Sequence, residues 1–408
     1  MSIFSRRLNK TPLGIYIHVP FCRSKCNYCD FYSMPCKDDA LMDSYLDAVC
    51  AHIKEAGALA PGYRVDTIYF GGGTPSYFGG DAIAIIMTAI RRNFDVATDA
   101  EITFECNPDS VTDKLLHRMR AEGFNRVSMG VQDDHDDMLK KLGRPHTYAQ
   151  SVAAFQRIRK AGFRNVSLDL MYGLPGQTLQ DWRDTLENVL KMNPEHFSCY
   201  GLKLEEGTKL YEIKDVINIP DDDTQADMYL AAVDMLRERG FRQYEISNFA
   251  RTGRESRHNL KYWTLGEYAG FGPGAHSDFG GVRYAYEKDL EGYIRGVKDH
   301  TPMLSENDRI PDLDRDTEWV MLGLRTVQGL DPADFQRRFR RRFDCFLPFL
   351  AQCQKAGYAV EEAGRWHLTP RGFLVSNQII GGMLDALAEE KRRRAEATAR
   401  GDFRVKLD

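Results

Sequence analysis

Six short apolar runs alternate with longer helical patterns in the first half of the chain, and this alternation limits the possible folds more than any other feature. The segments between the runs, such as residues 41–55 and 179–192, have the spacing of amphipathic helices. Buried strands that alternate with helices are typical of a parallel sheet covered by helices. Six consecutive units predict a partial α/β barrel, and a doubly wound open sheet is the competing architecture. The runs are GIYIHVPF, DTIYFGGG, EITFECNP, RVSMGVQ, NVSLDLMYGLP and HFSCYGLKL.

The sequence changes character after residue 250, where the predicted barrel of residues 1–250 ends. Residues 251–310 are rich in Gly, Tyr and polar residues, and we expect them to form a connecting segment. Residues 311–388 have mostly helical patterns, interrupted by GYAVEEAGRWHLTPRGF, which resembles a hairpin that leads into a helix. This combination predicts a small winged-helix-like domain. Residues 389–408 are expected to form a charged tail that is helical at first.

Composition excludes several classes of protein. The formal net charge of -4 argues against a dedicated nucleic-acid binder, which is usually basic. No apolar run is long enough to span a bilayer, and the N-terminal residues lack the apolar region of a secretory signal. The chain has nine cysteines, an odd and scattered set that does not suggest a disulfide framework. We therefore expect a protein of the reducing cytoplasm.

Polar residues stand at the C-terminal end of each predicted strand. In α/β barrels this rim is where functional sites are built, because the carboxyl ends of parallel strands meet there. Each residue alone could be a helix cap or part of a turn, but six coincident strand ends indicate a site. In chain order these residues are Cys22, Gly71 to Thr74, Glu105, Asn107, Gln132, Asp169, Tyr172 and Lys203.

Three cysteines follow the first strand with the spacing C-x3-C-x2-C, at Cys22, Cys26 and Cys29. A structural zinc site would need a fourth ligand, for which His18 is the nearby candidate, although a buried histidine is the simpler interpretation. A redox C-x-x-C pair would leave Cys22 without a role. A [4Fe-4S] cluster held by three thiolates keeps one iron open for a small molecule. The spacing is typical of a cluster that binds S-adenosylmethionine (SAM) through that iron.

Several motifs together resemble a known family. The cysteine motif with its aromatic Tyr28 resembles the radical SAM superfamily, and the wider set resembles the oxygen-independent coproporphyrinogen III oxidase-like family. The resemblance runs from about Tyr16 into the C-terminal domain. It implies a partial (β/α)6 barrel followed by a winged-helix-like domain. The motifs are YIHVPFC, CNYCDF, YFGGGTPS, FECNPDS, GFNRVSMGVQ, LKKLGRPH and LDLMYGLPGQT.

The resemblance also implies roles for individual residues. It makes Cys22, Cys26 and Cys29 the cluster ligands. The glycine loop would meet the amino group of SAM, since backbone carbonyls suit an ammonium and a missing Cβ permits close approach. Carboxylates can accept the ribose hydroxyls, and an arginine can pair with the methionyl carboxylate. The implied SAM-site residues are Tyr16, Tyr28, Gly72, Gly73, Thr74, Glu105, Gln132, Arg144 and Asp169.

Two departures indicate which branch of the family the chain resembles. The true oxidases carry a further cysteine just after the third ligand, where this chain has Phe31, and they have a longer N-terminal arm. In contrast, SRHNLKYW at residues 256–263 matches the HNxxYW motif of a heme chaperone branch. The match implies that His258 ligates heme iron while Tyr262 and Trp263 stack on the macrocycle, with His276 also near the barrel mouth. Without the family, the same residues would be interpreted as a capped turn and a core aromatic.

Three functions therefore follow from the resemblance. The first is a chaperone that binds heme and passes it to an acceptor protein, which could be membrane-bound and reached by peripheral association. The second is an oxygen-independent coproporphyrinogen dehydrogenase, and the third is an enzyme that modifies or degrades heme. Phe31, the short N-terminus and the HNLKYW sequence favour the chaperone.

The arginines of FQRRFRRRF are interpreted as a solvated helix face and not as a nucleic-acid site.

Overall fold

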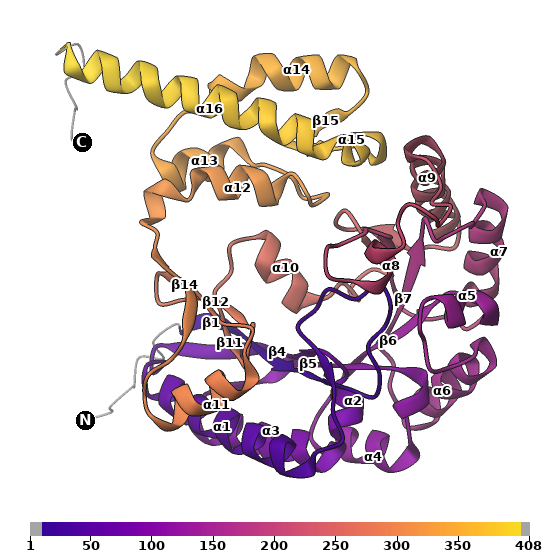
Figure 1. Cartoon of the computed structure of the whole chain (residues 1–408). Helices are drawn as coiled ribbons and strands as arrows, with labels where there is room; N and C mark the ends of the chain where they lie inside the picture. The colour runs from indigo at the N-terminus through magenta and orange to yellow at the C-terminus, as the bar shows by residue number, and fades with distance from the viewer. Residues whose placement is uncertain (1–9, 401–408) are drawn as a thin grey trace, which may run out of the picture. The chain divides into compact units, whose positions relative to one another are not determined.

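One sheet of twelve strands organises the larger part of the described chain, residues 10–400, in the computed structural model (Figure 1). Six neighbouring strands at its centre are parallel and follow one another in sequence order. A doubly wound sheet would reverse its strand order at a switch point, and no reversal occurs among these six strands. The partial (β/α)6 barrel is therefore confirmed. The six strands are β1 (Thr11–Val19), β4 (Tyr63–Gly72), β5 (Val96–Cys106), β6 (Arg126–Gln132), β7 (Val166–Tyr172) and β8 (His196–Gly201).

Helices connect these strands and lie along the outer side of the sheet (Figure 1). Their starts are encoded locally: Thr147 and Gln150 form a capping box at one helix, and Thr178 and Asp181 form another. The longer helices are α1 (Asp39–Ala58), α3 (Gly80–Asn93), α4 (Asp113–Ala121), α6 (Tyr148–Lys160), α7 (Leu179–Leu190) and α9 (Asp222–Glu238). The shorter ones are α2 (Pro75–Phe78), η1 (Pro108–Ser110), α5 (Asp136–Lys141) and α8 (Lys209–Glu212).

The segment predicted to be a connector continues the sheet instead. Its first strand pairs parallel with β1, and three antiparallel strands follow. The first compact unit accordingly runs to residue 309, except for residues 243–246 and 262–265. These strands are only four to six residues long, which is too short for their periodicity to separate them from loops. The elements are α10 (Arg257–Trp263), β11 (Tyr268–Phe271), β12 (His276–Phe279), β13 (Val282–Tyr286), α11 (Leu290–Lys298) and β14 (Leu304–Arg309).

The second compact unit contains residues 243–246, 262–265 and the chain from residue 310. Its helices surround a two-stranded hairpin, β15 (Ala359–Glu362) with β16 (Arg365–Leu368), at the position where a hairpin was predicted. The last helix runs past residue 389, so the predicted boundary of the tail is not a structural break; residues 401–408 lie outside the described range. The helices are η2 (Asp312–Asp314), α12 (Asp316–Gly323), α13 (Pro332–Phe339), η3 (Phe343–Phe346), α14 (Leu347–Lys355), α15 (Pro370–Leu374) and α16 (Ser376–Ala399).

The aromatic residues of FQRRFRRRF form the core of this second unit. The Phe335 ring lies 5.4 Å from Trp319 and 5.2 Å from Phe339, measured between ring centroids. The intervening arginines face acidic partners, since both Arg337 and Arg338 contact Asp334. This arrangement agrees with a solvated basic helix face. No helix within residues 10–400 is both long and apolar enough to cross a membrane.

Candidate functional site

A cavity of about 330 Å³ opens at the C-terminal ends of the parallel strands. Side chains from all six strand ends, or from the loops that follow them, line it, as expected for a barrel of this kind. Most of the strand-end residues that the sequence singled out are thus brought together in one place, although Gly71 and Tyr172 are not among the lining residues. The lining includes Cys22, Cys26, Tyr28, Cys29, Gly72, Gly73, Thr74, Glu105, Gln132, Arg144 and Asp169.

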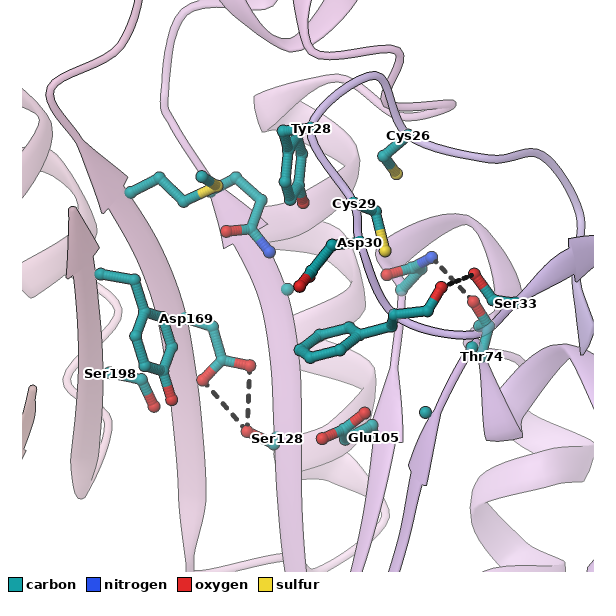
Figure 2. Close-up of a pocket in the computed structure, with 18 of the residues that line it drawn as sticks. Cys26, Tyr28, Cys29, Asp30, Ser33, Thr74, Glu105, Ser128, Asp169 and Ser198 are labelled. Atoms are coloured by element: carbon teal, nitrogen blue, oxygen red, sulfur yellow. Dashed lines mark hydrogen bonds between the residues drawn. The ribbon is translucent and has the colours of Figure 1, made fainter. Parts of the chain in front are cut away.

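The cysteine loop spans two short paired strands, β2 (Phe21–Cys22) and β3 (Met34–Pro35). Its middle is tied to neighbouring elements through Asn27, whose backbone N–H donates to the Leu142 carbonyl at 2.9 Å. The Asn27 carbonyl accepts from the Leu210 N–H, also at 2.9 Å. The Lys25 ammonium donates to the carbonyls of Phe31 and Ser33 and thereby closes the loop on itself. The loop therefore has a defined shape that holds its three thiols at the cavity wall, and Figure 2 shows two of them, Cys26 and Cys29.

The three thiols are suited to a metal cluster. All three are free, and burial raises the pKa of the Cys22 and Cys29 thiols above the ordinary value. A bound metal ion reverses that tendency, because coordination deprotonates a thiol outright. The Thr74 hydroxyl lies 3.4 Å from Cys22 Sγ, and Arg144 Nη1 donates to Cys26 Sγ at 3.5 Å. Soft sulfur donors with polar groups around them match the requirements of a [4Fe-4S] cluster with one open iron.

His18 does not belong to this donor set. Its side chain is buried, with Nδ1 3.1 Å from the Tyr16 hydroxyl and Nε2 2.7 Å from the Tyr32 carbonyl. Both ring nitrogens are therefore occupied by hydrogen bonds, as the simpler interpretation of this histidine expected. Tyr16 is held by the same contact and is not among the residues that line the cavity. Tyr28 lines the cavity, and the placement of Tyr16 beside the cofactor stays a prediction.

The glycine loop after β4 packs directly on the cysteine loop. The Gly73 N–H donates to the Val19 carbonyl at 2.7 Å, and the Thr74 N–H donates to the Phe21 carbonyl at 2.8 Å. A Cβ added at Gly73 would lie 2.7 Å from the Phe21 carbonyl oxygen and 3.0 Å from Cys22 Sγ. Only glycine allows this approach, so the loop is more than an ordinary turn.

Arg144 lies inside the cavity wall and is not a surface cap. Its Nη2 donates to Asn107 Oδ1 at 2.7 Å and to the Gly130 carbonyl at 2.8 Å. A Cβ at Gly130 would lie 3.0 Å from the same nitrogen, so the guanidinium packs closely on the strand. Arg144 Nε is buried and has no hydrogen-bond partner among the described residues. A buried guanidinium with an unused donor is suited to a carboxylate ligand.

Two half-buried carboxylates, Glu105 and Asp169, extend into the cavity from β5 and β7 (Figure 2). The Tyr69 hydroxyl donates to Glu105 Oε1 at 2.8 Å, and Ser128 Oγ donates to both Asp169 oxygens at 3.1 and 3.0 Å. Burial raises the pKa of Glu105 to about 7, against the lowering effect of the Tyr69 hydrogen bond. Burial also raises the pKa of Asp169. Both groups are acceptors whose charge a cationic or hydroxyl-bearing ligand would stabilise.

Gln132 is held in a left-handed backbone conformation, with φ of 72°. The register between β6 and β7 shifts between Gly130 and Gln132, so the strand carries an irregularity where it reaches the cavity. A non-glycine residue with positive φ costs free energy, and such strain concentrates at functional sites. This geometry supports Gln132 as a ligand-contacting residue.

The residues that the sequence analysis assigned to heme differ in how far they are buried. His258 is only 1 % exposed, its Nδ1 lies 2.8 Å from Thr67 Oγ1, and its ring stacks on Tyr69 at 5.2 Å. Burial lowers the pKa of His258 to about 3. His258 is therefore a buried, hydrogen-bonded side chain in this structure, and its role as a heme ligand stays a prediction. The side chain of His276 is 54 % exposed, at the start of β12. Tyr262 and Trp263 are half-buried residues of the second compact unit.

A second group of titratable residues lies outside the cavity. Ligand atoms of Asp133, Asp134 and His135 come within 4.8 Å of one another. Asp134, however, accepts hydrogen bonds from Thr185 Oγ1 and Asn188 Nδ2, both at 2.6 Å. These bonds connect the start of α5 to α7, so the group is explained by its structural hydrogen bonds.

The structure adds cavity residues that the sequence did not assign to a ligand. Asn107 positions Arg144, Ser128 positions Asp169, and Cys106, Phe31 and Tyr200 line the cavity. For Asn107 and Lys203, the position at the end of a predicted strand was the feature of the sequence that indicated a place in the site. The serine contact depends on the pairing of neighbouring strands and has no signature in the sequence.

Comparisons with known proteins agree with this geometry. The model of the radical SAM superfamily matches residues 16–189, and that of the HemN C-terminal domain matches residues 310–375. The chain is 34 % identical to the heme chaperone HemW of Bacillus subtilis (strain 168) over 376 residues, which cover 91 % of this chain and 99 % of that protein. It is also 34 % identical to the heme chaperone HemW of Escherichia coli (strain K12) over 375 residues, covering 90 % and 97 %.

Among solved structures, the coproporphyrinogen III oxidase HemN from Escherichia coli is similar to this chain. The TM-score is 0.81 and the sequence identity 27 %, and the match covers 92 % of this chain and 90 % of that one. Both compact units therefore have counterparts in a known radical SAM structure, because the match extends over nearly the whole chain.

Proposed function

Because this chain belongs to the HemW family of heme chaperones, within the radical SAM superfamily, we propose that it binds heme and transfers it to an acceptor protein. The observation that carries the proposal is the similarity to these chaperones, which extends over almost their entire length. A chaperone of this kind binds its cargo without changing it chemically. The heme that leaves the protein is then the heme that entered.

Proteins with the radical SAM scaffold bind a [4Fe-4S] cluster and SAM. We propose that Cys22, Cys26 and Cys29 hold three irons of the cluster, since their thiols line one cavity. The fourth iron would remain open to SAM, for which a cavity of about 330 Å³ has a suitable size. When bound, the cluster and SAM would supply redox chemistry.

The remaining cavity residues would orient SAM. The unused Nε donor of Arg144 supports pairing with the methionyl carboxylate. Glu105 and Asp169 would accept hydrogen bonds from the ribose hydroxyls, and Gln132 would contact the same ligand. Gly72, Gly73 and Thr74 would approach its amino group, since all three line the cavity beside the cysteine loop.

An oxidase is the second candidate, because the HemN structure is similar over nearly the whole chain. Phe31 argues against it, since the phenyl ring stands where the oxidases carry an additional cysteine. A phenyl ring can neither ligate a metal nor transfer a thiol hydrogen. The chaperone therefore remains the better-supported function.

We propose His276 as the histidine that can reach heme iron, in place of the buried His258. Its imidazole is 54 % exposed, and its Nδ1 is 3.9 Å from Glu306 Oε2. An imidazole is a common axial ligand of heme iron. The acceptor would be a heme protein of the cytoplasm or one bound to a membrane that the chaperone approaches from the cytoplasmic side.

Anaerobic incubation with SAM and each tetrapyrrole tests the proposal. The reconstituted protein is mixed with heme or with coproporphyrinogen III, and the products are separated and identified. Heme recovered unchanged at a defined stoichiometry, and transferred to an apo-heme protein, is the expected result. Conversion of coproporphyrinogen without heme binding would establish an oxidase instead, and ring-opened heme would establish a degrading enzyme.

The ligand assignment has its own readout. His276→Ala should alter the Soret band and the low-spin signal in electron paramagnetic resonance, whereas His258→Ala should leave both unchanged in any folded protein. An unaltered spectrum in His276→Ala would refute the assignment of His276 without affecting the chaperone function.

A further inference from the structure

Two aromatic side chains at the cavity are exposed. Phe31 is 62 % exposed and Tyr200 is 42 % exposed, and both line the same cavity. Phe31 lies in the cysteine loop, two residues after Cys29, and Tyr200 lies near the end of β8. Single exposed apolar residues are common on protein surfaces, but two large aromatics at one cavity indicate a binding surface.

The backbones of these two residues are fixed although their side chains are exposed. The Phe31 carbonyl accepts a hydrogen bond from Lys25 Nζ at 2.7 Å. Tyr200 is paired with Met171 in the parallel ladder of β7 and β8. Rings on a fixed backbone lose little conformational freedom when they contact a ligand, so binding to them costs less entropy.

The cavity that these rings line is small and also carries charged side chains. Its walls carry Glu105, Asp169 and Arg144, which suit the polar groups of SAM. A volume of about 330 Å³ is near the lower end of ordinary ligand pockets, which extend from roughly 300 to 1,000 Å³. A tetrapyrrole could not enter in addition to SAM. A large flat cargo would have to bind at the cavity mouth.

A lysine ammonium lines the same cavity as the two rings. Lys203 lines the same cavity, its side chain is 81 % exposed, and its Nζ contacts Glu205 Oε1 at 2.5 Å. An exposed ion pair of this kind contributes little stability, so the lysine can exchange its partner for another carboxylate. Heme offers the matching chemistry, since it is a flat aromatic macrocycle with two propionates.

We propose that Phe31, Tyr200 and Lys203, here called the rim, bind heme at the mouth of the cluster and SAM cavity. The inference rests on the proposed chaperone function and specifies where the cargo lies. Phe31 and Tyr200 contact the face of the macrocycle, and Lys203 pairs with a propionate. The outer edge of a heme bound at the rim remains accessible to an acceptor protein. The edge of a fully enclosed heme would not be accessible.

Rim variants test the proposal on the reconstituted protein with SAM bound. Phe31→Ala and Tyr200→Ala should each weaken heme affinity about ten-fold, because each removes an aromatic contact together with its buried apolar area. Phe31→Trp should retain affinity because it keeps a ring. Ile85→Ala is the matched control, since Ile85 is 51 % exposed on α3 outside the cavity. Iron content and SAM affinity report whether each variant is correctly folded.

The role of Lys203 is tested with a second ligand. Lys203→Gln should weaken heme binding several-fold but leave the affinity for heme dimethyl ester unchanged, because the ester has no carboxylate to pair. If wild-type protein binds no heme, the chaperone proposal itself fails. If wild-type protein binds heme and both ring variants bind it as tightly as Ile85→Ala does, the rim is refuted while the chaperone function stands.

Discussion

Replacing Gly73 by alanine tests whether the glycine loop and the cysteine loop form one packed unit. The added Cβ would lie 2.7 Å from the Phe21 carbonyl oxygen, 2.9 Å from the Val19 carbonyl oxygen and 3.0 Å from Cys22 Sγ. Two of these atoms belong to the backbone, so no change of rotamer can relieve the contact. The strand end and the first cluster ligand must therefore move apart.

The expected cost follows from these distances. Forcing an extra methyl group into a packed site costs about 1–3 kcal/mol. Part of this strain would appear as a displacement of Cys22, because its sulfur is among the three nearest atoms. We therefore expect the free energy of unfolding of the cluster-free protein to fall by about 1–3 kcal/mol and the reconstituted cluster content to fall with it.

Gly62→Ala is the matched control, because a Cβ at Gly62 would have no atom within 4 Å. Urea unfolding followed by circular dichroism measures stability, and iron and sulfide analysis measures the cluster. A Gly73→Ala protein with the same urea midpoint as Gly62→Ala and wild-type iron content would refute the packing described here.

Three further predictions test the site. Cys26→Ala should lose the [4Fe-4S] cluster in iron and sulfide analysis, whereas Cys36→Ala, outside the cavity, should retain it. Asp169→Ala should weaken SAM binding about ten- to a hundred-fold by calorimetry, with an intact cluster; unchanged affinity would contradict the pocket. Because ionised Glu105 is the better acceptor and its pKa is raised to about 7, SAM affinity should rise about ten-fold from pH 6 to 8. Glu105→Gln should abolish that rise.

The central fold was predictable because its signal is local. Every second residue of each parallel strand is apolar and buried, as Ile15, Ile17 and Val19 show in β1. The continuation of the sheet in β11 to β14 was not predictable in the same way. Its strands are short, and glycines such as Gly272 and Gly274, both with positive φ, break any periodicity.

The cluster site was also visible in the sequence, since its three thiols lie within eight residues. Contacts between distant residues were not. Arg144 reaches Asn107 across 37 positions, and only the folded barrel shows that the guanidinium is inside the wall. The same holds for His258, whose motif suggested a ligand but does not show that Thr67, 191 positions away, contacts Nδ1 in the interior.

The contrast between the interior and the mouth of the cavity explains how one scaffold can serve a carrier instead of an enzyme. An enzyme encloses its substrate to exclude water and to fix the reacting atoms. Here the cysteine loop is held by Leu142, Leu210 and the glycine loop, so the cluster site is fixed, while Phe31 and Tyr200 remain exposed above the polar interior. A cargo bound to such exposed rings is stabilised mainly by apolar contact and can be released when an acceptor covers the same face. A fixed interior with an open mouth is therefore compatible with the proposed binding and transfer of the cargo.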